Sequence, residues 1–424
     1  MDAVDVAIIV VKAIVAFALW LVGTALLIWG ERRVVAKMQS RIGPNRLGPA
    51  GLMQTLADGA KLFFKEDITP SNVDRLVYLA APFVSAVVAL MTFAVIPFGG
   101  TFELAGRQVS LQVWDPNIGL LWILAMSSLG VYGIVLAGWS SGSKYPLLGG
   151  VRSSAQLVSY ELAMGLSLAA VFIYNGSLQS SQIVAAQSAR LAGVDIPVLG
   201  DILRALPAWN IVPMAPAFVI FFVAVVAETQ RPPFDLPEAE GELVAGFITE
   251  YSGAKFAMFF LAEFMNVITV SAVTVTAFLG GPSGPLFGLD GTFLGALLGL
   301  LYFVLKVFVF VFVFIWLRGT LPRFRYHRLM DLGWKVMLPL ALLWVLATGF
   351  AVTLRQQGLT ETGRSVALVV LGVAIALSLA APLFASKPQT DDEGASGDGR
   401  LRPSGADSDP RSLESETKSD KAGV

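Results

Sequence analysis

Two glutamates stand inside long apolar stretches of the sequence, where an ionised side chain is energetically costly. Glu161 lies about two helical turns into SSAQLVSYELAMGLSLAAVFIY, and Glu263 lies in KFAMFFLAEFMNVITV, eight residues after Lys255. On a helix, eight residues span ~12 Å along the axis. A buried carboxylate tends to bind a proton, because an apolar medium disfavours its charged form. Carboxylates of this kind, linked by water, can accept and pass protons.

More carboxylates are concentrated in the acidic segment, AETQRPPFDLPEAEGELVAGFITEYSG, which runs from Ala227 to Gly253 between two apolar stretches. It contains one cation, Arg231, and six carboxylates: Glu228, Asp235, Glu238, Glu240, Glu242 and Glu250. Glu238 and Glu242 are four residues apart, so on a helix they share a face, repel each other and titrate as a coupled pair. The prolines predict a new helix that begins near Pro237. Interleaved apolar residues argue against the alternative of a simply solvated acidic loop.

Other charged side chains stand at or inside the apolar stretches. Glu31 ends the first stretch, Glu228 ends the fifth, and Lys306 lies within the seventh, where it can pair with one of the acids. For Glu31 and Glu228, a structural role at a helix end is an equal alternative to proton transfer. For Glu161 and Glu263, the depth in the apolar stretch favours a functional role.

The composition indicates a membrane protein without its own redox centre. Of 424 residues, 55% are hydrophobic and only 14% are charged, whereas a soluble chain carries roughly 25% charged residues. The absence of cysteine excludes disulfides, thiolate metal sites and Cys-ligated iron–sulfur clusters. The single histidine, His327, cannot build a metal or haem site alone, and we interpret it as a surface or interface residue. The net charge of -1 gives no reason to expect nucleic acid as a partner.

Hydropathy predicts an all-α polytopic membrane protein with about nine spans, because the apolar runs approach the ~20 residues that cross a bilayer. The predicted spans are residues 6–30, 76–97, 118–138, 155–174, 211–228, 255–280, 293–317, 335–354 and 365–386. Cations are concentrated in the first and seventh connections, which the positive-inside rule places in the cytoplasm. The N-terminus is then outside, and the acidic segment is cytoplasmic. The N-terminal stretch begins acidic and lacks a small-residue cleavage site, so we interpret it as a membrane helix and not as a signal peptide.

Two further segments differ from the spans. GLMQTLADGAKLFFKE has apolar residues at helical spacing, with Asp58, Lys61 and Lys65 largely on the other face, which predicts an amphipathic helix at the membrane interface. The chain after Lys387 is rich in Ser, Asp, Gly and Pro and almost free of large apolar residues. We therefore expect a transmembrane domain over residues 1–386 and a disordered cytoplasmic tail over residues 387–424.

Four segments carry a family resemblance: ERRVVAKMQSRIGPNRLGPAGLMQTLADGAKLFFKED, SSAQLVSYELAMGLS, the acidic segment, and LRGTLPRFRYHRLMDLGWKVMLPL. They resemble the signature segments of the quinone-site membrane subunit (subunit 1, or the H subunit) of respiratory complex I, the proton-pumping NADH:quinone oxidoreductase. The resemblance covers about residues 1–386. All four motifs are long, which makes the match specific.

The resemblance implies a subunit of the cell inner (plasma) membrane where the peripheral arm meets the membrane arm. A quinone, ubiquinone or menaquinone, would enter through a channel lined by the first span, the interfacial helix and cytoplasmic loops. NADH, FMN and the iron–sulfur clusters would belong to partner subunits. The implied partners are the quinone-site subunits of the peripheral arm, small membrane subunits, antiporter-like subunits and membrane lipid.

Roles are carried over by motif position. The residues implied for the quinone channel are Glu31, Arg32, Asp58, Lys61, Arg231, Asp235 and Arg318. Those implied for the proton path and its coupling to quinone are Glu161, Glu228, Glu238, Glu240, Glu242 and Glu263. Some family members carry a further carboxylate in the span before Glu161, but LLWILAMSSLGVYGIVLAGW has none. We expect Tyr132 or a water molecule to bridge this step.

Two alternatives belong to other classes. A free-standing cation/proton antiporter would use Glu161, Glu263 and Lys306 as its intramembrane site. The lack of a visible internal repeat counts against it, since many secondary transporters contain one. A membrane subunit of a quinone- or ferredoxin-linked hydrogenase would share much of the sequence pattern, and nickel or flavin in the isolated assembly would distinguish it.

Overall fold

The computed structural model describes residues 3–104, 106–188, 208–235, 243–285, 289, 291–356 and 372. Their longer helices are α1 (Ala3–Met38), α3 (Arg75–Phe93), α4 (Gly119–Ser140), α5 (Lys144–Asn175), α10 (Gly253–Phe278), α11 (Phe293–Thr320) and α13 (Leu338–Gln356). The shorter helices are η1 (Pro49–Gly51), α2 (Gln54–Phe64), α6 (Ser180–Ser188), α8 (Ala215–Glu228), η2 (Gly246–Ile248), α12 (Tyr326–Asp331) and the π-helix η3 (Leu332–Met337). Strands β1 (Thr101–Leu104) and β2 (Arg107–Ser110) form one antiparallel hairpin.

The predicted fold class is confirmed. Within the described ranges, seven helices are long and apolar enough to cross a membrane, the last of them running continuously over Tyr326–Leu354. The predicted fifth span is α8, whose 14 residues extend only ~21 Å. The ninth predicted span, residues 365–386, and the predicted tail lie outside the described residues apart from Gly372.

Two helices continue well beyond the predicted spans. Helix α1 runs on past Glu31 to Met38, and α5 begins at Lys144, about three turns before the predicted start. Charged residues lower the mean hydropathy of this first part of α5, so that it was not predicted as part of the span. Glycines let it pack closely, since a Cβ added to Gly149 would lie 2.7 Å from Gly246, and one added to Gly150 would lie 3.2 Å from Gly138.

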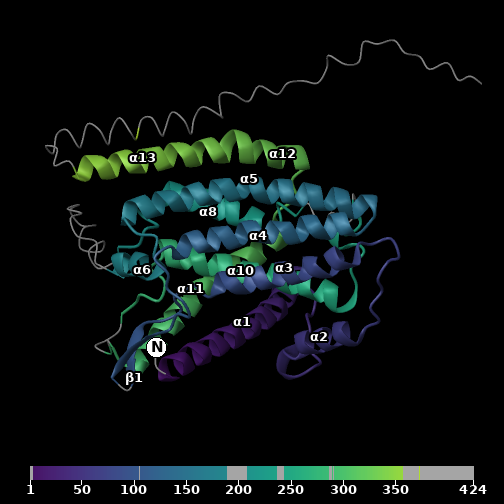
Figure 1. Cartoon of the computed structure of the whole chain (residues 1–424), viewed down its shortest axis with the longest axis horizontal. Coiled ribbons are helices and arrows are strands. Elements are labelled where there is room, and N and C mark those ends of the chain that lie inside the picture. Colours follow the sequence, from purple (N-terminus) through teal and green to yellow (C-terminus); the bar gives the residue numbers. More distant parts are fainter. Residues whose placement is uncertain are drawn as a thin grey trace, which may run out of the picture. The chain divides into compact units, whose positions relative to one another are not determined.

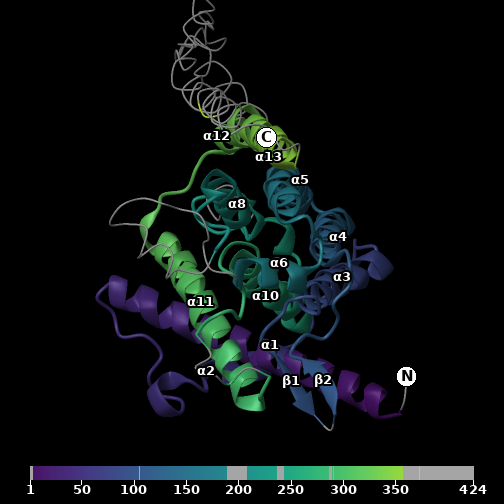
Figure 2. The same cartoon turned by 90° about the vertical axis from the view of Figure 1, so that its left-hand side faces the viewer.

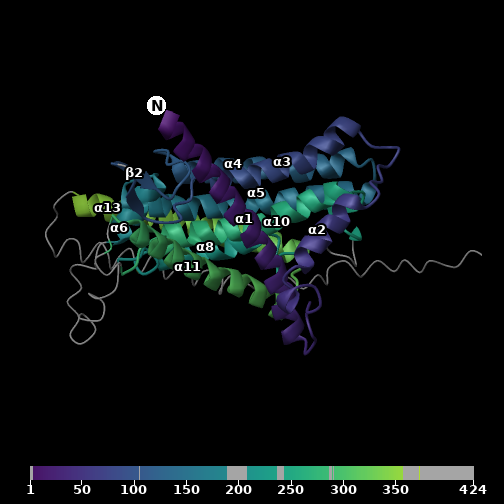
Figure 3. The ribbon, with the colours of Figure 1, turned by 90° about the horizontal axis from the view of Figure 1, so that it is seen from below.

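The spanning helices form a row crossed by α1. Figure 1 shows α13, α5, α4 and α3 side by side, with α8 and α10 packed against this row. Helix α1 crosses α10 and α11, as the turned view in Figure 2 shows. Seen from below, α2 lies beside the C-terminal part of α1 (Figure 3). Aromatic rings fill the space between α8, α10 and α11; for example, Phe218 lies 5.4 Å from Phe278 and 6.2 Å from Phe310 between ring centroids.

The hairpin was not predicted, because four-residue strands leave little hydropathy signal. Its inward side chains, Phe102 and Val109, pack on Ala296 of α11. The register pairs Thr101 with Ser110 and Leu104 with Arg107. The hairpin thus covers the N-terminal end of α11.

Lys306 has a different role from the one expected. Its Nζ donates hydrogen bonds to the carbonyls of Leu279 (2.8 Å), Gly281 (2.9 Å) and Ser283 (2.8 Å), and lies 5.2 Å from the centre of the Trp209 ring. These carbonyls follow the last turn of α10, where a cation is favoured by the helix dipole. The expected ion pair between Lys306 and a buried acid is therefore wrong. This removes the central cation of the antiporter alternative.

Candidate functional site

A buried ionic cluster joins three parts of the chain that are far apart in sequence. Arg231, 3% exposed, follows the end of α8 and lies between Glu31 of α1 and Glu263 of α10. Its Nη1 is 3.4 Å from Glu31 Oε1, and its Nη2 is 3.2 Å from Glu263 Oε1. Arg318, near the end of α11, forms a second ion pair with the same oxygen of Glu31. Two guanidinium groups thus face two carboxylates, which offsets the cost of burying each charge.

The turn that follows α8 positions the Arg231 side chain in this cluster. Gln230 has a φ of +52°, a left-handed conformation that reverses the chain directly after the helix. Gln156 of α5 fixes both ends of the turn, because its Nε2 donates to the carbonyls of Ala227 and Phe234, each at 2.9 Å. Sequence reasoning missed Gln156. The sequence signal that could have identified it is a glutamine inside a predicted span, less than two helical turns from Glu161.

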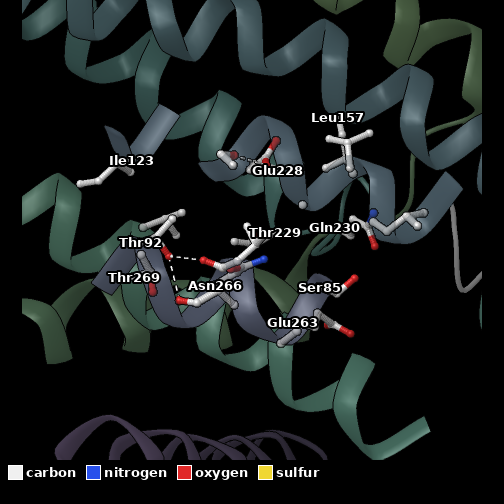
Figure 4. A pocket seen from close by; sticks show the side chains of 18 of the residues that line it. Ser85, Thr92, Ile123, Leu157, Glu228, Thr229, Gln230, Glu263, Asn266 and Thr269 are labelled. Atoms are coloured by element: carbon white, nitrogen blue, oxygen red, sulfur yellow. Dashed lines mark hydrogen bonds between the residues drawn. The ribbon is translucent and has the colours of Figure 1, made fainter. Parts of the chain in front are cut away.

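A small cavity, largely apolar but with several polar groups on its wall, lies between the ionic cluster and α8. Its volume is about 100 Å³, and both Glu263 and Glu228 line it. Figure 4 shows Glu228 on one side and Glu263 on the other, with Thr229, Gln230 and Asn266 between them. Three buried polar atoms on its wall have no hydrogen-bond partner within the described part of the chain: Glu228 Oε2, Gln230 Nε2 and Ser85 Oγ. This space exceeds the ~10–15 Å³ that one water molecule needs, and water bound there can satisfy such groups.

Two serines of α4 donate hydrogen bonds to the carboxylates of Glu228 and Glu161. Ser127 Oγ donates to Glu228 Oε1 at 2.8 Å, and Ser128 Oγ donates to Glu161 Oε1. Glu161 stands near the middle of α5 and opens on a larger pocket of about 970 Å³. The carboxylates of Glu161 and Glu228 are near enough to repel each other when both are ionised.

The expected bridge by Tyr132 is not what holds these carboxylates. Tyr132 lines the same pocket as Glu161, but its side chain is 61% exposed, and the hydrogen bonds to the acids come from the serines. The adjacent Ser127 and Ser128 inside an apolar span were the sequence signal for this arrangement. His327 is exposed, as predicted.

The acidic segment is described at its two ends. Asp235 is half-buried just after the turn fixed by Gln156. At the other end, Tyr78 Oη donates to the carbonyl of Glu250 at 2.7 Å, and the Tyr78 and Tyr251 rings stack 4.2 Å apart. The predicted residues Glu238, Glu240 and Glu242, and the helix expected near Pro237, lie outside the described residues. Their roles remain predictions.

The interfacial helix α2 is attached to α1 by polar contacts. Arg32 forms an ion pair with Asp58, and Gln54 Nε2 donates to the other oxygen of Asp58 at 3.0 Å. Trp29 Nε1 and Arg33 Nη1 donate to the carbonyl of Ala50, just before α2, at 3.1 and 2.5 Å. Apolar side chains of α2 remain strongly exposed: Leu56, Phe63 and Phe64. The predicted amphipathic character is confirmed, and it suits a helix that lies on a lipid surface.

Asp58 gives this attachment a defined pH dependence. Burial alone would raise the pKa of Asp58, but hydrogen bonds from Arg32 and Gln54 and the charges of Arg32 and Lys61 outweigh it, so the pKa lies below its usual value. A carboxylate whose pKa is lowered on folding stabilises the fold above its unfolded pKa of ~3.9 and loses this effect as the pH falls through the folded pKa. Since Asp58 is 33% exposed, the contribution is below ~1 kcal/mol.

We therefore expect α2 to stay attached between pH 8 and pH 5. Hydrogen exchange of residues 54–64 in the intact protein assembly, corrected for its intrinsic pH dependence, should show constant protection over this range. Asp58→Asn should lower protection by less than about fivefold, because an exposed pair contributes below ~1 kcal/mol. Loss of protection in the unmodified protein between pH 7 and 5 would contradict this assignment.

Comparisons with known proteins identify one family. A sequence model described as NADH dehydrogenase matches residues 11–349. The proteins named as the H subunit of NADH-quinone oxidoreductase from Frankia casuarinae and Frankia alni are 51% and 50% identical to this chain over 377 residues, which cover 89% of this chain and 79% of each relative. The protein of the same name from Streptomyces avermitilis is 48% identical over 388 residues, covering 89% of this chain and 81% of that protein. The resemblance seen in four sequence segments thus extends over most of the chain, which belongs to the family of the H subunit, a membrane subunit of NADH-quinone oxidoreductase (respiratory complex I).

Proposed function

We propose that this chain forms the quinone access channel of complex I and the first buried-carboxylate path between quinone reduction and proton translocation. The proposal rests on a series of contacts that leads from the ionic cluster, through the cavity and Glu228, to Glu161. Glu263 belongs to the cluster and also lines the cavity with Glu228. Beyond Glu228, α4 connects to Glu161 and its outer pocket.

The channel end of the proposal rests on α1, α2 and the cluster. Helix α1 packs against α2, α10 and α11, and these helices, with the turn after α8, carry six of the seven residues expected in the channel, all except Asp235: Glu31, Arg32, Asp58, Lys61, Arg231 and Arg318. A quinone that arrives from lipid would pass the exposed apolar side chains of α2. Reduction of a quinone takes up two protons, so charges that neutralise one another near the channel can respond to that uptake.

The remaining parts of the proposal follow from the family. The chain would hold no redox centre, and electrons would come from NADH through FMN and iron–sulfur clusters of partner subunits. Peripheral-arm, small membrane and antiporter-like subunits would surround it. The N-terminus would lie outside and the acidic segment in the cytoplasm, where Glu238, Glu240 and Glu242 would take part in coupling quinone reduction to the proton path.

Glu228→Gln in the assembled complex tests this proposal. The amide keeps the size of the side chain but cannot exchange a proton, so quinone reduction coupled to proton pumping should fall about tenfold or more. Electron transfer from NADH to ferricyanide, which does not require the quinone site, should be unchanged. Glu103→Gln, which removes an exposed carboxylate on β1, is the matched control. Normal quinone turnover with normal pumping in Glu228→Gln would refute the proposal.

A further inference from the structure

Helix α4 lies between two cavities, the inner one lined by Glu228 and Glu263 and the outer one by Glu161. Glu228 and Ser127 line the inner cavity, while Glu161 and Ser128 line the outer pocket. The two cavities share only two lining residues among those described, Leu124 and Val131, and both are on α4. These apolar side chains stand about one turn on either side of the serines. The wall between the cavities is therefore apolar except for the hydroxyl groups.

The two serines are bonded to carboxylates from different helices. Ser127 donates to Glu228 of α8, and the Ser128 hydroxyl can donate to Glu161 of α5 or, at 3.1 Å, to the Leu124 carbonyl of its own helix. Successive residues on a helix point ~100° apart, so an adjacent pair can reach two neighbouring helices where a single side chain reaches one. A serine hydroxyl has one donor hydrogen and two acceptor lone pairs. It can accept a proton on one side while it releases its own on the other.

We propose that Ser127 and Ser128 are the proton-transfer link between Glu228 and Glu161, which takes the place of a carboxylate or tyrosine in this span. The inference rests on the proposed function. Because the two hydroxyl groups point in different directions, a water molecule between them completes the link. In one transfer the carboxyl group of Glu228 gives a proton to Ser127, Ser127 releases its own to this water, the water releases one to Ser128, and Ser128 releases its own to the carboxylate of Glu161. The hydroxyl groups and the water molecule end unchanged. No oxidant, reductant or further reactant takes part.

The surroundings of Glu228 are consistent with this direction of transfer. Ser127 occupies Oε1, while Oε2 is buried on the cavity side without a partner among the described residues. Oε2 can thus take up a proton from cavity water while Oε1 stays in contact with the serine. Repulsion between Glu228 and Glu161 disfavours the state in which both are ionised.

The test compares alanine and threonine variants of both serines in the assembled complex. Ser127→Ala and Ser128→Ala should each lower quinone turnover and pumping about tenfold or more and increase the solvent deuterium isotope effect. Ser127→Thr and Ser128→Thr keep the hydroxyl and should retain most activity and an unchanged isotope effect. Ser167→Ala is the control, since Ser167 is buried on α5 and donates to the Met164 carbonyl of its own helix at 2.7 Å.

The outcomes separate this inference from the proposed function. Unchanged turnover, pumping and isotope effect in both alanine variants would overturn the serine link, and if Glu228→Gln is still inactive, the proposed function stands without it. Equal losses in the alanine and threonine variants would also overturn it, because they would show a packing effect. If an alanine variant does not assemble, the cysteine variant replaces it under the same criterion, since a thiol is similar in size but a weak donor.

Discussion

Arg231→Gln should prevent normal assembly of the complex. Arg231 is 3% exposed and neutralises carboxylates of two different helices, Glu31 and Glu263. Removing one partner of a buried ion pair costs about 3–5 kcal/mol, because the remaining charge stays in a medium of low dielectric constant. A loss of this size is a large part of the ~5–15 kcal/mol that stabilises a typical domain. The amount of complex on a native gel and its thermal inactivation would measure the effect.

A second variant isolates the electrostatic cause. Arg231→Gln combined with Glu263→Gln removes one charge of each sign, while Glu31 keeps its ion pair with Arg318. Assembly should recover in this double variant relative to Arg231→Gln alone. Arg323→Gln, which changes an exposed arginine after α11, serves as the control. If Arg231→Gln assembles normally, or if the double variant is the less stable of the two, the cluster does not hold these helices together.

Glu161→Gln should have the largest effect on function. The amide oxygen can still accept the hydrogen bond from Ser128, so the fold and the assembly should be unaffected. The side chain can no longer bind and release a proton, and quinone turnover and pumping should therefore fall about 10- to 100-fold. Native gels, ferricyanide reduction, quinone turnover and quenching of a pH-sensitive dye in vesicles would measure assembly, electron input and pumping in the same preparation.

Glu161→Asp provides the matched comparison. The shorter acid keeps an exchangeable proton and should retain more activity than the amide. Equal loss in both variants would indicate that the position of the side chain matters and that its proton does not. Full pumping in Glu161→Gln would remove Glu161 from the path.

Much of the fold and part of the site follow from sequence alone. Eight of the nine predicted spans coincide with helices in the described residues, and seven of these helices are long enough to cross a membrane, because burial in lipid demands a long continuous apolar run. Depth within the apolar stretches singles out Glu161 and Glu263. The motifs that resemble this complex I family identify Glu31, Arg231 and Arg318, which the structure brings into one cluster.

What could not be predicted depends on contacts between distant segments. Glu31 and Arg318 are 287 residues apart, and their pairing requires α1 and α11 to cross. Lys306 is a cation in a span, and no sequence pattern distinguishes a helix cap on three carbonyls from an ion pair. The first part of α5 was missed because its charged residues lower the mean hydropathy, and a hydropathy average does not detect the close packing of its glycines.

If Glu228 belongs to the proton path, it changes its protonation when quinone is reduced. Infrared difference spectra of the complex, recorded on quinone reduction, test this most directly because a protonated carboxyl group has its own carbonyl band. A carboxyl band should shift or appear in the unmodified complex and be missing in Glu228→Gln. The same band, unaltered in both complexes, would contradict this role of Glu228.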